Sequence, residues 1–137
     1  MRYGGVAAHL GLTGDYGIAD VLARGDEIDA GVIGSTAVHH GDQLDILLSP
    51  ATTDFNDPAP LQGDRFPQAV EVFRSVYGAT YVDAPALVPD AQAELAMMST
   101  AVLIVMSPTV RELWVTRATL EALAKRDVAT PVTIAVN

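Results

Sequence analysis

The clearest periodic pattern in the chain is a helical one between residues 64 and 78. Apolar side chains recur there every three or four residues, which places them on one face of a helix. They are Phe66, Ala69, Val70, Phe73, Val76 and Tyr77. Asp64 is placed to cap the start of this helix, and Gly78 to end it. The pattern predicts an amphipathic helix that buries one face in a core.

Short apolar runs bounded by turn residues predict four strands. They cover residues 44–48, 81–83, 101–106 and 131–136. The run 101–106 is continuous and apolar, as expected for a strand that is buried on both faces. The run 81–83 ends on Asp83 and is followed closely by Pro85.

Helical segments are expected between these strands. Short helices are predicted at 6–10 and 18–23, a third at about 28–38 begun by Asp26 and Glu27, and a fourth at 90–98 capped by Asp90. A long helix starts near Pro108 and runs to about residue 126, with Val110, Leu113, Leu120 and Ala124 as its core stripe. The stretch 51–63, with two prolines, is expected to be a loop. This alternation predicts an α/β fold over residues 1–137, one domain with a parallel sheet and helices on both faces.

Charge and composition narrow the function classes. The formal net charge is −9, with a single lysine, Lys125, so direct binding to nucleic acid or anionic lipid is disfavoured. The chain has no cysteine, which excludes disulfides and thiolate chemistry and fits a cytoplasmic protein. The apolar runs are too short to cross a bilayer, and no signal peptide is evident. We therefore expect membrane contact only through a partner.

The order of these segments resembles that of the MinD/ParA group of deviant P-loop ATPases, especially the branch with CpaE, TadZ and MinD. The segments that carry the likeness, in chain order, are residues 2–12, 17–22, 44–50, 81–85, 103–108 and 132–137. No single segment is specific, and their order is the evidence. The resemblance implies a P-loop NTPase-like fold, ATP with Mg²⁺ as cofactors, an ATP-dependent dimer, and a role in positioning cellular machinery.

The resemblance also implies site residues. The segment 81–85 (YVDAP) matches the Walker B strand, so Asp83 would be the catalytic carboxylate that holds Mg²⁺ through water. Asn137 would contact the nucleotide base, and Pro108 would lie in the turn beside the nucleotide. The alternatives are an aspartate that caps the turn after a strand, a frayed terminal residue, and a proline at a helix start.

Two departures weaken the ATPase interpretation. The pattern G-x-x-x-x-G-K-[ST] does not occur, and the family's first strand, phosphate loop, following helix and second strand would all precede Met1. The run after Asp83 is Ala84-Pro85-Ala86, whereas the family often has a second proline or a glycine there. We expect ATP in a full-length form and weak or no binding by this chain. The alternative is a non-enzymatic interaction module, with a homodimer or a partner protein completing the sheet.

Other candidate sites are less specific. His39, His40 and Asp42 lack a third ligand at metal-binding spacing, so a solvated loop is expected there, and His9 is expected on a helix surface. Gly11, Gly14 and Gly17 do not match a dinucleotide-binding loop, and Asp54 and Asp57 are expected in solvated turns. Trp114 and Tyr77 are expected to be packing residues. A flavodoxin-like or receiver-type domain with Asp83 as its functional acid remains open, although the acidic pair and the strand-end lysine of receivers are missing. The pattern G-x-S-x-G does not occur, so an α/β-hydrolase is not supported.

Overall fold

A computed structural model describes the protein over residues 5–48, 65–84 and 89–137. The chain divides into two compact units, Met1–Ala86 (unit 1) and Leu87–Asn137 (unit 2), and each is considered by itself. The expected loop at 51–63, with Asp54 and Asp57, and the expected cap at Asp64 lie outside the described residues. The expectation of one domain over residues 1–137 stays a prediction.

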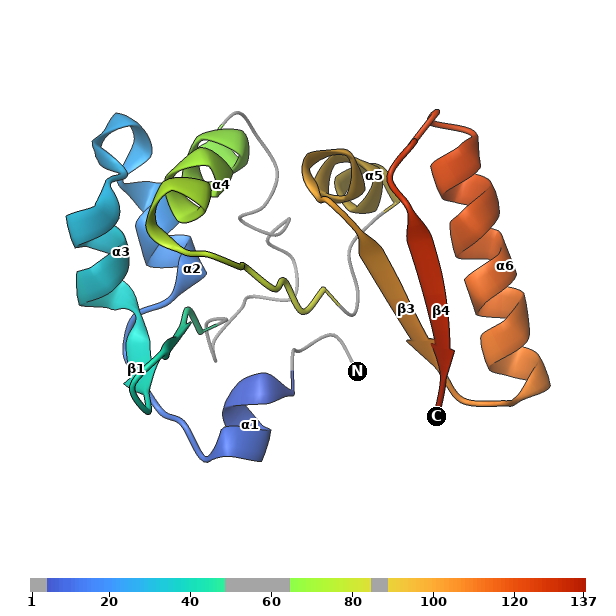
Figure 1. The fold of residues 1–137 in the computed structure, drawn as a ribbon, viewed down its shortest axis with the longest axis horizontal. Coiled ribbons are helices and arrows are strands. Elements are labelled where there is room, and N and C mark those ends of the chain that lie inside the picture. Colours follow the sequence, from blue (N-terminus) through green and yellow to red (C-terminus); the bar gives the residue numbers. More distant parts are fainter. Residues whose placement is uncertain (1–4, 49–64, 85–88) are drawn as a thin grey trace. The chain divides into compact units, whose positions relative to one another are not determined.

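Unit 1 contains most of the short elements. In chain order they are α1 (Val6–Leu10), α2 (Ile18–Ala23), the 3₁₀ turn η1 (Gly25–Glu27), α3 (Ala30–Thr36), β1 (Val38–His40), β2 (Leu44–Ile46) and α4 (Arg65–Val76) (Figure 1). Helices α2, α3 and α4 pack against one another. His9 is exposed on α1, as predicted.

The predicted amphipathic helix is confirmed as α4. Phe66, Ala69 and Phe73 are buried on it, while Val76, at the end of the same stripe, is exposed. Among the described residues, Val21 of α2 and Ile33 of α3 are the largest fully buried side chains. The core of unit 1 therefore lies among three helices, where apolar stripes of short helices meet.

The predicted third helix needed correction at both ends. Residues 28–38 do not form one helix. Asp26 and Glu27 lie in η1, and α3 begins after Asp29, whose carboxylate accepts a hydrogen bond from the Val32 N–H at 2.8 Å. Asp29 is thus the N-cap, because its side chain satisfies a backbone donor that the first helical turn leaves free.

Residues 38–46 form an antiparallel hairpin. Val38 pairs with Ile46, His39 with Asp45, and His40 with Leu44, around a turn in which Gly41 has a φ of +67°. The expected strand at 44–48 is therefore present as β2, but its neighbour is antiparallel β1. The solvated loop expected at His39 and His40 was wrong, since both residues lie in a strand.

The start of α2 is held tightly against the end of the β2 segment. The Ile18 N–H donates to the Leu48 carbonyl at 2.9 Å, and the Gly17 N–H donates to the Asp20 carboxylate at 2.8 Å. A Cβ on Gly17 would come within 2.0 Å of the Leu48 oxygen. Only glycine fits there, because the obstacle is backbone.

Unit 2 is a strand–helix–strand unit with one further helix. Its elements are α5 (Pro89–Met98), β3 (Val102–Met106), α6 (Val110–Ala124) and β4 (Val132–Val136). β3 and β4 are parallel neighbours joined by α6, in the register Val102↔Val132 to Met106↔Val136 (Figure 1). This pair confirms the predicted strands at 101–106 and 131–136 and a coarse α/β character.

The larger parallel sheet was not found in the described residues. They form two sheets of two strands each, and residues 81–83 have no strand structure. Tyr81 and Val82 are exposed. The aromatic and β-branched residues of this run favour a strand, but no described strand pairs with them, so no strand forms. What the described residues show is a mixed α/β arrangement, not a P-loop NTPase fold.

The core stripe predicted for the long helix was largely wrong. Val110, Leu113 and Ala124 are exposed on α6, and Leu120 is half-buried. The buried residues are Thr116 and Leu123. Leu123 packs with Ala93 and Ala96 of α5, beside Val102 and Val132 of the strands. The buried face of α6 therefore differs from the face that was predicted from the hydrophobic positions alone.

Candidate functional site

The role that the Walker B resemblance implies for Asp83 stays a prediction, since the described residues around it form no strand. Asp83 lies in an irregular, exposed segment after α4, and its carboxylate has no described strand to hold it in place. Among the described residues, no group of three His, Asp or Glu side chains is arranged to hold a metal ion. A Mg²⁺ site normally needs converging oxygen ligands, which Asp83 lacks among its described surroundings.

Asn137 and Pro108 belong to unit 2. The Asn137 N–H donates to the Met106 carbonyl at 2.9 Å, so its backbone continues the β3–β4 ladder. Pro108 precedes the N-cap of α6, Thr109, whose hydroxyl accepts from the Glu112 N–H at 3.2 Å. The predicted helix start is confirmed to within two residues, and these contacts are structural.

The described residues do not bring together the groups that ATP with Mg²⁺ would need. The sequence supplies no phosphate-loop lysine, and Asp83 is exposed, with no metal-holding group of side chains among the described residues. Phosphate binding needs converging backbone N–H groups or a basic side chain.

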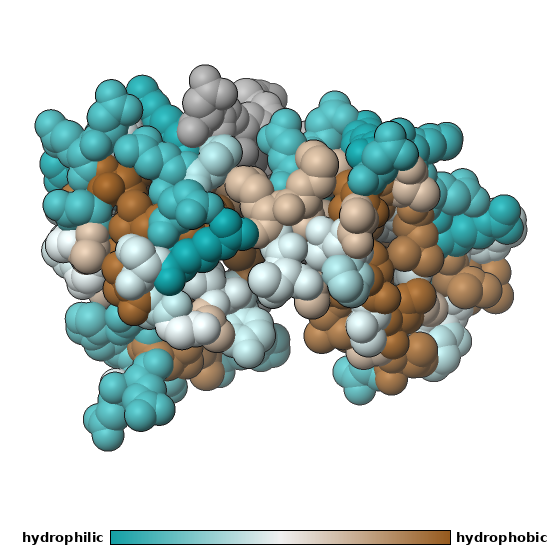
Figure 2. Space-filling model, turned by 45° about the horizontal axis from the view of Figure 1, so that its top comes forward, coloured by the Kyte–Doolittle hydropathy of each residue, from teal (hydrophilic) through white to brown (hydrophobic). Residues whose placement is uncertain are grey.

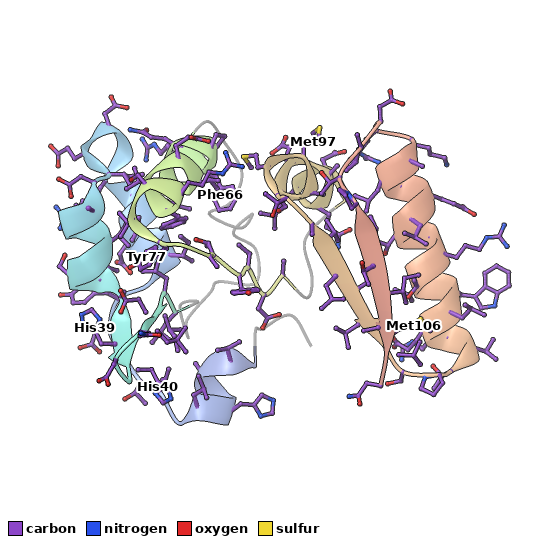
Figure 3. All side chains as sticks on the ribbon, viewed as in Figure 1. His39, His40, Phe66, Tyr77, Met97 and Met106 are labelled. Carbon is purple, nitrogen blue, oxygen red and sulfur yellow. The ribbon has the colours of Figure 1, made fainter. Side chains whose placement is uncertain are left out.

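A polar cluster joins the hairpin to the end of α4. The Asp45 carboxylate contacts the His39 Nδ1 at 2.5 Å through one oxygen and accepts from the Tyr77 hydroxyl at 2.9 Å through the other. Figure 3 labels His39 and Tyr77. His39 and Asp45 are cross-strand partners in the hairpin register. The cluster therefore ties three segments of unit 1 together.

The same contacts change the acidity of the cluster. Hydrogen bonds from His39 and then Tyr77 hold the pKa of Asp45 below its ordinary value of 3.8. Partial burial, followed by the bond to Asp45, raises the pKa of Tyr77 above 10.0. Tyr77 is half-buried, so its expected packing role is combined with a polar one that its place in an apolar stripe did not reveal.

The outer edge of the parallel sheet in unit 2 has backbone groups that are unpaired among the described strands. Backbone hydrogen bonds run from the Val102 N–H to the Pro131 carbonyl and from the Asn137 N–H to the Met106 carbonyl. Successive strand residues direct their backbone groups to opposite sides, so Val132, Ile134 and Val136 direct theirs to the outer edge of β4. No described strand pairs with that edge.

The side chains along the same edge are poorly covered. Met106 is 8% exposed and contacts the Thr116 hydroxyl of α6 through its sulfur, whereas its register partner Val136 is 63% exposed (Figure 3). Ile134 is 44% exposed. Helix α6 therefore covers β3 at this end of the sheet and leaves bare the side chains of Ile134 and Val136, here called the open flank of β4.

Further apolar side chains of unit 2 are exposed. On the strand faces they are Leu103 and Val105, and on α6 they are Val110, Leu113, Trp114 and Val115. The expectation that Trp114 is a packing residue was wrong, since it is exposed, with the Arg117 guanidinium 5.8 Å from its ring centre. In Figure 2, brown surface gathers over the part of the molecule formed by unit 2. Exposed apolar surface of this kind marks interaction sites.

Charge is distributed unevenly between the units. Unit 2 carries four basic and five acidic side chains, a formal net charge of −1, whereas unit 1 carries four basic and twelve acidic ones, a net charge of −8. The strands β3 (VLIVM) and β4 (VTIAV) contain no charged residue. Natural edge strands are usually protected by charges, prolines or bulges, so an uncharged edge favours pairing.

Compared with known proteins, the chain matches no family model, and no curated protein or solved structure is significantly similar to it. The resemblance to MinD/ParA ATPases thus stays a prediction. No helix in the described ranges is both long and apolar enough to cross a membrane.

Sequence reasoning missed two features of these sites. The Asp45–Tyr77 contact joins residues 32 positions apart, which no local pattern indicates. The open flank of β4 arises because α6 lies over one strand of the pair, and both strands have the same apolar, β-branched character in the sequence. The absence of charge along both strands was the one available signal.

Proposed function

We propose that this protein is a non-enzymatic interaction module that binds another polypeptide through the sheet of unit 2. The observation that carries the proposal is the outer edge of β4, where uncharged strand backbone and the open flank lie together. An extended chain could add to this edge, with main-chain hydrogen bonds supplying affinity and apolar side chains supplying contact area. The cytoplasm is the expected location, because the chain has no cysteine.

A pair of strands by itself is a weak unit. Two-stranded sheets are marginal in water, and parallel sheets are usually larger and covered on both faces. Adding a strand would satisfy the outward N–H and C=O groups of Val132, Ile134 and Val136. It would also shield the open flank, and apolar burial contributes about 25 cal/mol per Å².

The test is site-specific photocrosslinking in cells. A photoreactive amino acid at Val136 should give adducts of defined mass, because this side chain lies at the proposed binding edge. The matched control is the same group at Asp42, which is exposed in the turn between β1 and β2 of unit 1. Equal labelling from both positions, or none from Val136, would contradict the proposal.

A second proposal follows from the resemblance to MinD/ParA ATPases: the chain is the C-terminal portion of an ATPase that positions cellular machinery. It is supported by β3 and β4, which are parallel neighbours joined by a helix and correspond to the last two strands of the resemblance. Titration with Mg²⁺-ATP tests it. Binding that Asp83→Asn abolishes would favour the ATPase proposal, and absence of binding to the full native protein would count against it.

A further inference from the structure

We propose that the polypeptide bound at β4 is a second copy of this chain, with the two β4 strands pairing antiparallel about a two-fold axis at Ile134. This proposal rests on the interaction-module function and names its partner. The pairing would join two β3–β4 pairs into one continuous four-stranded sheet. Each copy would present the same surface, as a two-fold interface requires.

The backbone geometry suits this register. Ile134 directs its N–H and C=O away from β3, and so do Val132 and Val136. With Ile134 opposite Ile134 of the second copy, these two residues exchange both hydrogen bonds. Val132 then lies opposite Val136 of the second copy and bonds in the same way, so every outward group of β4 gains a partner.

The side chains are self-complementary in the same register. The cross-strand pairs are Ile with Ile, Val with Val, and Thr133 with Ala135, all of them uncharged. Apolar and β-branched pairs across neighbouring strands are favourable, whereas like charges directly opposite are not. Two copies of β4 can therefore pair without placing like charges opposite one another.

The position of α5 and α6 on one face of the sheet also favours a second copy as the partner. The open flank, formed by Ile134 and Val136, lies on the sheet face that α5 and α6 cover elsewhere. A two-fold axis perpendicular to the sheet puts the helices of both copies on this same face. The two open flanks then meet at the axis, between the helices, and shield each other from water.

Charge favours association through unit 2 over unit 1. Two copies that approach through unit 2 bring together surfaces of net charge −1, while unit 1 carries −8. Repulsion between like-charged surfaces opposes association, and salt screens it. An acidic chain of net charge −9 can therefore pair with itself most readily at its nearly neutral unit.

A charge-exchange experiment tests the register. Ile134→Lys and Ile134→Glu each place like charges opposite one another at the axis, so each variant alone should remain a monomer near the chain mass of 14.4 kDa in sedimentation equilibrium. The wild-type chain should reach twice that mass as concentration rises. Mixing the two variants should restore the dimer, because the ammonium group introduced in one copy would then face the carboxylate introduced in the other.

A proline variant tests the backbone contribution. Ile134→Pro replaces the outward N–H with a ring carbon, on the side of β4 that faces away from β3. Two hydrogen bonds per dimer are lost and the ring carbon crowds the opposite carbonyl, so dimer affinity should fall by at least about tenfold to hundredfold. Ile134→Val is the matched control, because valine has as many side-chain carbons as proline and keeps the N–H. Circular dichroism of each variant verifies that it is folded.

The lack of cysteine allows a third readout. Ile134→Cys should form a disulfide-linked dimer under mild oxidation, because the paired Cα atoms would lie about 5.5 Å apart. Leu103→Cys, exposed on β3, is the control and should not. A wild-type monomer at all concentrations, or a dimer that persists in the separate Ile134→Lys and Ile134→Glu variants, would overturn the proposal. Photocrosslinks from Val136 only to other proteins would overturn it too, while the interaction-module function would stand.

Discussion

At the scale of single residues, the Asp45 carboxylate connects two segments of unit 1. It accepts from His39 within the hairpin and from Tyr77 at the end of α4. A carboxylate that bridges segments far apart in the sequence fixes their relative position with two directional contacts. Removal of this carboxylate should therefore loosen the connection between the hairpin and the end of α4.

Tyr77→Phe removes one of these bonds and keeps the ring. The free energy of unfolding at neutral pH should fall by about 1 kcal/mol, the usual net worth of a hydrogen bond. Because the pKa of Asp45 is held below 3.8, its contribution is present above that value and lost as the pH falls further. The gap between wild type and Tyr77→Phe should therefore narrow in acid.

At alkaline pH, the stabilising contribution of Tyr77 is lost as the pH rises, whereas that of Asp45 is lost as the pH falls. The pKa of Tyr77 is raised above 10.0, so its contribution is complete below that value and lost as the pH rises through the folded-state pKa. Urea unfolding of both proteins, followed by circular dichroism across the pH range, measures the change in stability at acid and at alkaline pH. A constant difference between the two proteins at all pH values would exclude the Asp45–Tyr77 contact as its source.

At the scale of elements, the sequence predicts those structures whose signals are local. The spacing of Phe66, Ala69 and Phe73 was enough to predict α4, since one helix face holds the whole signal. The apolar runs at 101–106 and 131–136 likewise predicted β3 and β4. Such runs combine β-branched composition with flanking turn residues, so both strands were found with nearly correct ends.

The errors lie where partners decide the outcome. Residues 81–83 have strand-like composition, but no described strand lies beside them, so propensity did not become structure. His39 and His40 gave no apolar signal, yet cross-strand pairing with Asp45 and Leu44 makes them a strand. The core face of α6 depends on where α5 and the strands lie, which the helix's own sequence does not record.

The corrected face of α6 predicts a contrast between two leucines. Leu123→Ala should lower the free energy of unfolding by about 2–3 kcal/mol, because Leu123 is 5% exposed among α5 and the strands. Leu113→Ala, at a site that is 60% exposed on the same helix, should cost less than about 0.5 kcal/mol. Thermal or urea unfolding compares them, and equal costs would show that the exposed face is covered.

At the scale of the whole molecule, net charge limits the classes of partner. A chain with 17 acidic and 8 basic residues repels polyphosphates unless its basic groups are clustered. Ion pairs such as Arg117 with Glu121 and Arg126 with Asp90 further engage basic side chains of unit 2. Nucleic acid is accordingly a poor candidate for a direct partner.

This limit is testable under conditions that favour binding. In low-salt buffer, where phosphate contacts are strongest, titration of the protein into fluorescent single-stranded or duplex DNA should leave the anisotropy unchanged. A basic protein of similar mass serves as the positive control. Saturable binding that weakens steeply with added salt would show that basic groups converge in a way the net charge conceals.

The contact between Gly17 and the Leu48 carbonyl has a consequence for the order of folding. It joins segments about 30 residues apart, and closing a loop of that length carries an entropy cost before α2 can dock. The β3–β4 pair of unit 2 closes a loop of nearly the same length, since Val102 pairs with Val132, but the 15-residue helix α6 lies within that loop. During synthesis, unit 1 emerges first, and its closure includes this narrow fit. A slow or failed closure would expose Val21 and Ile33 to the cell's chaperones before unit 2 had been made.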